Sequence, residues 1–397
     1  MRQPSPSAPE IASPVEMIRR LVAFDTTSSK SNLALIDDVR GYLAAHGVES
    51  RLIPDESGAK ANLFATIGPA VEGGVALAGH TDVVPVEGQP WSSEPFTLAE
   101  RGGKLYGRGT SDMKSFIAIA LALVPEFQKR GLKRPLHLCL SYDEEVGCFG
   151  MPRLLARLGR ELPKPALAII GEPTEMKVVH AHKGVWSQST TITGRDGHSS
   201  APQRGVNAIL YMGRFIAYLE QLGERLREQG LRGVPPGLEF DPPWSTVGIG
   251  RIRGGTAMNI IPRTCTLDWE VRVLPGVEPA SIRAEVDAWL RDELLPQLRR
   301  DAPEASIVTE KIAAVPALQP EETGAAETLA LRLTGANRAV TAAFASEAGQ
   351  FQETGISAVM CGPGSIAQAH QPDEFISLEQ VAAGEAFLRR LADWAST

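Results

Sequence analysis

Val75-Ala-Leu-Ala-Gly-His80-Thr-Asp82 is an apolar run that ends in a histidine and an aspartate. Two further apolar runs end in acids: residues 136–142 lead into Asp143-Glu144-Glu145, and residues 166–171 lead into Glu172. Short continuous apolar runs bounded by Gly and Pro indicate strands that are buried on both faces, as in a parallel sheet. In open α/β sheets the working crevice lies outside the carboxyl ends of the strands. We therefore expect these acids and His80 to meet at one edge of one sheet.

The composition is that of an ordinary globular protein and excludes several other classes. The 397 residues are 43% hydrophobic and 22% charged, and 40 basic against 47 acidic residues give a net charge of −7. The basic residues are scattered, which argues against nucleic acid or an anionic membrane as the main partner. No apolar run approaches the roughly 18 residues of a membrane span, and residues 1–10 lack the apolar core of a signal peptide. Four cysteines lie far apart without a Cys-x-x-Cys pair, so we expect a reduced, cytoplasmic protein.

Strands and helices alternate up to about residue 183, which predicts an α/β architecture. A capping box at Ser13-Pro14-Val15-Glu16 predicts a helix to about residue 24. Further helices are expected at residues 31–46, 113–129 and 150–158, and strands at residues 62–67, 75–79, 136–142 and 166–170. The expected fold is α/β, with a mixed, largely parallel sheet flanked by helices.

The pattern changes between about residues 184 and 299. A long amphipathic helix at residues 205–228 and a second helix at residues 278–299 alternate there with strands at residues 186–193, 246–252 and 264–273. This β-α-β-β-α order predicts a separate two-layer α+β domain, residues 184–299, inserted into the first. The catalytic domain would then be discontinuous, residues 1–183 plus 300–397, with later helices at residues 321–333 and 378–395 and a strand at residues 357–361.

His80 and Asp82 have the spacing of a metal ligand and its carboxylate partner. In extended backbone their side chains point the same way, and a metal-bound histidine usually donates its second ring N–H to a carboxylate. The competing interpretation of an isolated His-x-Asp is a polar loop entry. Asp112, which opens an apolar helix, fits two roles equally well: a helix N-cap or a carboxylate that bridges two metal ions.

Glu144 and Glu145 are adjacent and project to opposite sides of an extended chain. One can bind a metal while the other faces the attacking water as general base. A run of acids is usually a solvated loop, but this run closes a buried strand, which favours function. Glu172 and His370 are unspecific when each is taken alone. Together with three of the residues above they give two imidazole nitrogens and a set of shared carboxylates, which matches a pair of zinc ions. That set is His80, Asp112, Glu145, Glu172 and His370.

The inserted domain carries candidates that spacing alone does not assign. His198 lies in a Gly-His-Ser-Ser turn, and Asn259 lies in the segment before the second strand of the expected pair. Arg272, between apolar strand residues, is either a paired structural arginine or a bidentate grip on a substrate carboxylate.

Four segments resemble the dinuclear zinc amidohydrolases of the acetylornithine deacetylase, succinyl-diaminopimelate desuccinylase, aminoacylase and carboxypeptidase group. They are residues 77–85, 107–114, 143–147 and 171–174, and the resemblance extends from about residue 14 to the C-terminus. Within that group, residues 182–184, 197–200, 204–209 and 362–374 are most similar to the acetylornithine deacetylase branch. Before the last histidine the chain has Ala345-Ser-Glu347-Ala-Gly-Gln350 in place of the segment typical of the desuccinylase branch.

The resemblance implies a zinc aminopeptidase-like catalytic domain that hydrolyses N-acetyl-L-ornithine to L-ornithine and acetate in arginine biosynthesis. It implies two divalent ions, Zn2+ or alternatively Co2+. His80 and Glu172 would bind one, Glu145 and His370 the other, and Asp112 would bridge them. By the same resemblance Asp82 orients His80 and Glu144 is the general base.

The resemblance also implies a homodimer joined through the inserted domain. His198 would enter the active site of the partner subunit as an oxyanion donor, while Arg272 and Asn259 hold the substrate α-carboxylate. Glu347 is a candidate for contacting the ornithine ammonium. The alternatives are another N-acyl-L-amino acid amidohydrolase, a desuccinylase or a dipeptidase of the same group, or a non-catalytic protein that binds metal or a small molecule.

Overall fold

A computed structural model describes residues 11–232 and 238–397, and the described chain divides into two compact units. The first comprises the chain up to His180 together with Pro320–Val340 and Ser346–Thr397. The second comprises Ala181–Gln319 and Thr341–Ala345. All four cysteines are buried and free.

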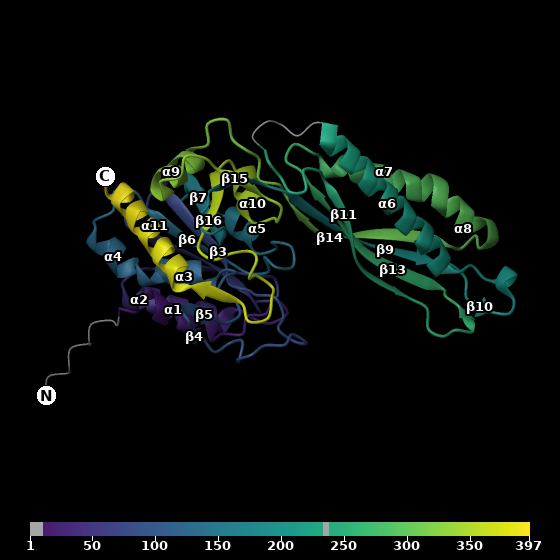
Figure 1. Ribbon diagram of the computed structural model, residues 1–397, viewed down its shortest axis with the longest axis horizontal. Helices are drawn as coiled ribbons and strands as arrows, with labels where there is room; N and C mark the ends of the chain where they lie inside the picture. Colours follow the sequence, from purple (N-terminus) through teal and green to yellow (C-terminus); the bar gives the residue numbers. More distant parts are fainter. Residues whose placement is uncertain (1–10, 233–237) are drawn as a thin grey trace. The chain divides into compact units, whose positions relative to one another are not determined.

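The first unit is built on an eight-stranded sheet with the strand order β1-β2-β6-β3-β7-β16-β8-β15, of which the last residues of β8 and β15 already belong to the second unit. Several strands of this sheet are labelled in Figure 1. The four central strands, β6, β3, β7 and β16, are parallel, whereas β1 pairs with β2, β2 with β6 and β8 with β16 in antiparallel fashion. The mixed, largely parallel sheet predicted from the apolar runs is thus confirmed. The strand bounds are β1 (Ser50–Pro54), β2 (Ala61–Ile67), β3 (Val75–His80), β6 (Leu136–Ser141), β7 (Leu167–Pro173), β8 (Val179–His182), β15 (Val340–Ala342) and β16 (Ser357–Gly362).

Helices flank this sheet. The first unit also contains a separate three-stranded sheet in the order β17 (Phe375–Ser377), β5 (Lys104–Tyr106) and β4 (Ala99–Arg101). The predicted helix at residues 113–129 is two helices, because Pro125 has no N–H to continue the first. The first helix begins at its predicted capping box, in which the Ser13 side chain caps Glu16. The helices are α1 (Pro14–Val22), α2 (Leu33–Ala45), α3 (Lys114–Ala122), α4 (Val124–Lys129), α5 (Met151–Leu155), α9 (Ala325–Thr334), α10 (Ala348–Glu353) and α11 (Leu378–Ser396).

Helix α3 fixes which face of the sheet the site residues occupy. It packs on β3 and β7, and a side chain at Gly171 would collide with Phe116, because a Cβ added there would lie 2.0 Å from the Phe116 Cγ. Glycine at this position therefore permits the close approach of the helix. Since successive side chains of a strand alternate between faces, Glu172 points to the face opposite α3.

The second unit has a four-stranded antiparallel sheet in the order β11-β13-β9-β14, with two long helical segments beside it. Helix α6 buries residues at intervals of three or four, including Met212, Phe215 and Leu219, as an amphipathic helix does on a sheet. The chain order is that of a split βαβ motif. The elements are β9 (Gly184–Thr193), α6 (Ala208–Arg232), β11 (Thr246–Gly254), β13 (Thr264–Val273), α7 (Pro279–Trp289), a π-helical turn (Leu290–Leu294), α8 (Leu295–Asp301) and β14 (Ser306–Val315), with the short pair β10 (Gly197–His198) and β12 (Ile260–Ile261).

Strand β14 changes the expected domain limit. The sequence pattern predicts an inserted domain that ends at residue 299, but β14 pairs with β9 from Ser306 opposite Thr193 to Val315 opposite Val185. Residues 300–319 therefore belong to the second unit, whose first segment ends at Gln319. The strand completes the sheet on the side of β9 away from β13.

Candidate metal centre

Sheet register brings the first two site residues together. His80, the last residue of β3, is paired with Ser141 at the end of β6, and on its other side β3 pairs with β7 with Ala78 opposite Ile170. Two residues further along each of these parallel strands are His80 and Glu172. They lie in neighbouring strands on one face, at the carboxyl edge that the sequence predicts as the crevice.

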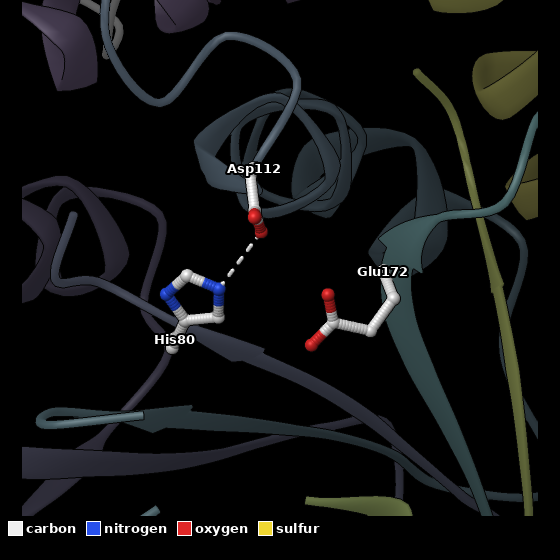
Figure 2. Close-up of side chains that lie close together, drawn as sticks. All are labelled: His80, Asp112 and Glu172. Atoms are coloured by element: carbon white, nitrogen blue, oxygen red, sulfur yellow. Dashed lines mark hydrogen bonds and ion pairs between the residues drawn. The ribbon is translucent and has the colours of Figure 1, made fainter. Parts of the chain in front are cut away.

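Asp112 joins these two residues from the loop that precedes α3 (Figure 2). His80 Nε2 lies 3.1 Å from Asp112 Oδ1, and the ligand atoms of His80, Asp112 and Glu172 all lie within 4.8 Å of one another. The three residues are 1%, 6% and 4% exposed. They form a buried three-ligand group of one nitrogen and two carboxylates.

A second group shares Asp112 with the first. His370 Nε2 lies 3.0 Å from Glu145 Oε2 and 3.5 Å from Asp112 Oδ2, and these three residues also offer ligand atoms within 4.8 Å of one another. The two oxygens of Asp112 thus face different histidines, Oδ1 facing His80 and Oδ2 facing His370. That is the arrangement of a carboxylate between two cation positions.

Burial and neighbouring charges shift the pKa values of the residues in these two groups. Burial, and then the charge of Asp112, raises the pKa of Glu172 well above its usual range and that of Glu145 to about 7. Burial also opposes ionisation of Asp112, but its hydrogen bonds to His370 and His80 hold its pKa below the usual value. Hydrogen bonds to Asp112 and Glu145 raise the pKa of His370 to about 10. The cluster therefore retains protons, and bound cations would replace them by favouring the ionised carboxylates and neutral imidazoles that bind metal.

The donor set fits two divalent ions of the zinc type. Imidazole nitrogens and carboxylate oxygens are zinc ligands in catalytic sites, where they leave room for water or substrate. Glu172 Oε1 is buried and has no hydrogen-bond partner in the described part of the chain, as expected for an oxygen reserved for a ligand. His80 Nδ1 lies 2.9 Å from the backbone oxygen of Asp82, to which it donates, and this leaves Nε2 free for a metal.

The Asp82 carboxylate has a different set of partners from the one expected. Its Oδ1 is 3.7 Å from His80 Nδ1, which is beyond hydrogen-bond distance. It accepts hydrogen bonds instead from the Ser28 hydroxyl at 2.6 Å and from the backbone N–H groups of Glu144 at 3.1 Å and Glu145 at 3.3 Å. Asp82 therefore holds the turn that carries both glutamates, and it reaches His80 through its backbone carbonyl.

Glu144 lies half-buried beside the two groups. Burial raises its pKa well above the usual range; His80 lowers the pKa, and Glu145 and Glu347 raise it. The Cys148 thiol donates a hydrogen bond to Glu144 Oε1 with a sulfur–oxygen distance of 3.4 Å. A carboxylate whose proton affinity is raised is suited to accept a proton from water near neutral pH.

Glu374 supports the centre and was not predicted from the sequence. Its carboxylate is 1% exposed and accepts hydrogen bonds from the backbone N–H groups of Gly109, Ser111 and Asp112 at 2.8–3.1 Å. Arg108 donates to its Oε2 at 2.6 Å. Glu374 therefore fixes the loop that presents Asp112.

The remaining candidates are not members of either three-ligand group. His198 is exposed on β10 with its Nδ1 2.7 Å from the Ser200 hydroxyl, and the Asn259 carbonyl accepts from Ser199 N–H at 3.0 Å. Arg272 on β13 donates from Nε to Glu270 Oε1 at 2.8 Å. These residues lie in the second unit, whereas Glu347 lies in the first, next to α10, and is 1% exposed. Burial, partly offset by the nearby Ser141 hydroxyl, raises the pKa of Glu347 to about 7.

Residues 76–394 match the model of peptidase family M20/M25/M40. The chain belongs to this family. It is 34% identical over 389 residues to an acetylornithine deacetylase of Pasteurella multocida (strain Pm70), covering 96% of this chain and 98% of that one. It is 37% identical over 387 residues to an acetylornithine deacetylase of Myxococcus xanthus, covering 94% and 95%.

A solved structure supports the fold of this M20/M25/M40 member. The M20 family metallo-carboxypeptidase Sso-CP2 from Sulfolobus solfataricus superposes with a TM-score of 0.75 at 15% identity, covering 97% of this chain and 99% of that one. As a member of the family the chain is a dinuclear metal-dependent hydrolase. None of the helices in the described residues combines the length and apolar character needed to cross a membrane.

Proposed function

We propose that this hydrolase cleaves N-acetyl-L-ornithine to L-ornithine and acetate, a reaction of arginine biosynthesis in the cytoplasm. The observation that supports it most is the likeness to relatives named acetylornithine deacetylase, which reaches 34–37% identity over more than nine-tenths of this chain. The small-molecule substrate would bind beside two Zn2+ ions, with Co2+ as the alternative metal.

His80 and Glu172 would hold one ion, Glu145 and His370 the other, and Asp112 both. When bound, the ions polarise the amide carbonyl and lower the pKa of water. Asp82 accepts a hydrogen bond from the backbone N–H of Glu144. This bond holds the turn, so that the Glu144 carboxylate is positioned before the substrate arrives.

Glu144 is the proposed general base. It takes a proton from the water that attacks the amide carbon and then delivers this proton to the leaving amine. The Cys148 thiol donates to one of its oxygens, which restricts the carboxylate to one orientation. Attack, collapse and protonation of the amine yield acetate and the free amino acid.

The second unit supplies the proposed recognition and the dimer contact. Arg272 can bind the substrate α-carboxylate bidentately, with Asn259 as a further donor, and His198 can donate to the oxyanion in the active site of the partner subunit. Strand β11 is a sheet edge on which Ile249 and Ile252 are 43% and 50% exposed. An edge strand offers unpaired backbone N–H and C=O groups that can pair with a second copy.

A substrate panel with bound zinc quantified tests the proposal. We expect N-acetyl-L-ornithine to have a higher kcat/KM than N-succinyl-diaminopimelate, N-acetyl-L-methionine or a dipeptide, at about two ions per chain. A preference for any of these other substrates would replace the proposed one with a different N-acyl amino acid, desuccinylase or dipeptidase reaction. Sedimentation equilibrium tests the dimer, and a monomer at micromolar concentration would contradict it.

A further inference from the structure

Helix α10 begins with two buried oxygen-bearing side chains that lack donors. Glu347, its N-cap residue, is 1% exposed, and Gln350 in the first turn is 6% exposed. Neither the carboxylate oxygens of Glu347 nor the Oε1 of Gln350 accept a hydrogen bond from the residues that the structure describes. The Ser141 hydroxyl is near Glu347 but makes no hydrogen bond of normal distance and angle with it.

These acceptors belong to the neighbourhood of the reacting groups. The charge of Glu347 acts on Glu144 and Cys148, and His80 and Asp82 act on Glu347. The Gln350 Nε2 donates to the backbone oxygen of Cys148 at 3.0 Å. Because this bond needs a donor, it identifies the bonded atom of the Gln350 amide as the nitrogen. The atom without a partner is therefore the oxygen, Oε1.

The chemistry of the set indicates its ligand. Buried carboxylates are almost always paired, since an unpaired buried charge is costly. When Glu347 is ionised, every unpaired atom of Glu347 and Gln350 accepts hydrogen bonds, so the missing group is a donor. A primary ammonium carries three donors, no acceptor and one positive charge, which complements one carboxylate and one amide oxygen.

We propose that Glu347 and Gln350 receive the side-chain ammonium of the substrate, so that the enzyme selects N-acyl derivatives of diamino acids. The inference rests on the proposed N-acyl amino acid hydrolysis and names the part of the substrate that decides selectivity. Among the residues with an assigned role, Glu347 is the specificity-determining one. It binds substrate and takes no part in the proton transfers of Glu144.

The test compares N-acetyl-L-ornithine with N-acetyl-L-norvaline, which has the same carbon chain without the ammonium. In the Glu347→Gln variant we expect kcat/KM for the ornithine substrate to fall on the order of 10²-fold, mainly through KM, while the norvaline substrate is cleaved as before. Glu353→Gln makes the same chemical change at an exposed position of α10 and should keep the wild-type ratio. Equal losses on both substrates, or an unchanged ratio, would overturn the inference.

A second variant keeps the charge and moves it. Glu347→Asp withdraws the carboxylate by one methylene, so N-acetyl-L-lysine, which is one methylene longer than the ornithine substrate, should gain at least several-fold relative to it. A purely structural role would not produce this shift, and its absence in a folded Glu347→Asp protein would count against the inference. The thermal midpoint of Glu347→Gln should not fall, because the variant removes an unpaired buried charge.

The outcomes separate this inference from the proposed function. If the wild-type enzyme prefers N-acetyl-L-norvaline, the proposed substrate and the ammonium site both fail. If the wild type prefers N-acetyl-L-ornithine but Glu347→Gln keeps that preference, the proposed function stands and the ammonium is bound elsewhere.

Discussion

The candidate residues of the two units differ in how firmly the protein holds them. In the first unit Asp112 is buried, its carboxylate faces two histidines and its backbone is fixed by Glu374. In the second unit His198 is exposed and its ring contacts Ser200, two residues away in the chain, while Arg272 contacts Glu270, also two residues away. Groups held by a buried network are positioned before substrate arrives, whereas exposed groups with local contacts take their working geometry when something binds. We therefore expect the first unit to supply the preorganised chemistry together with the proposed ammonium site, and the second unit to supply the groups proposed for the α-carboxylate and the oxyanion.

The largest effect should come from the general base of the preorganised unit. Glu144→Gln keeps the shape of the side chain but removes its ability to accept a proton, so kcat should fall by roughly 10²–10⁴-fold or more while metal content stays at the wild-type value. Steady-state kinetics with metal analysis measures both, and Glu161→Gln, at an exposed ion pair, serves as the matched control. Near-normal turnover by Glu144→Gln would refute its assignment as general base and, with it, the claim that the first unit supplies the chemistry.

Glu374 tests whether buried support is what holds the metal loop. Glu374→Gln leaves Arg108 without its buried charge partner and weakens three backbone hydrogen bonds, so the free energy of unfolding should fall by about 3–5 kcal/mol. Urea unfolding in the presence of a chelator measures this without a contribution from bound metal. The exposed Glu379→Gln should change stability by less than about 0.5 kcal/mol. Equal stability of the two variants would mean that the loop does not depend on Glu374.

The sequence predicts the parts of the site that follow local periodicity. His80 and Glu172 end continuous apolar runs, and parallel pairing alone places such ends at one edge. Glu374 is different, because its partners lie 262–266 residues away and its Asp-Glu surroundings are typical of a solvated turn. Strand β14 was missed because it is an edge strand with only two buried residues, so it lacks the apolar signal that marks the buried strands. The break before α4, in contrast, follows from Pro125 and could have been predicted.

The recognition half of the comparison can be tested by mixing two inactive proteins. His198→Ala should lose about 10²–10³-fold in kcat if the ring donates to the oxyanion. If His198 acts in the active site of the partner subunit, dimers exchanged between His198→Ala and Glu144→Gln contain one site with both groups intact. A statistical mixture should then recover about a quarter of wild-type activity. No recovery after verified subunit exchange would place His198 in its own subunit's site or outside the reaction.

The smallest effect compares one buried histidine from each unit. Burial lowers the pKa of His137 in the first unit and of His182 in the second to about 4. Because the unfolded chain binds more protons than the folded one between about pH 4 and 6.5, each histidine lowers stability as pH falls through that window, by about 2 kcal/mol between pH 7.5 and pH 5. His137→Gln and His182→Gln should each reduce the pH dependence of unfolding by that amount, and an unchanged dependence would mean that the ring is not held neutral.

Hydrogen exchange measured segment by segment in the same two variants shows whether the two units unfold independently. If they unfold independently, His182→Gln alters the pH dependence of exchange in the second unit and leaves the first unchanged, whereas cooperative unfolding spreads either change over both.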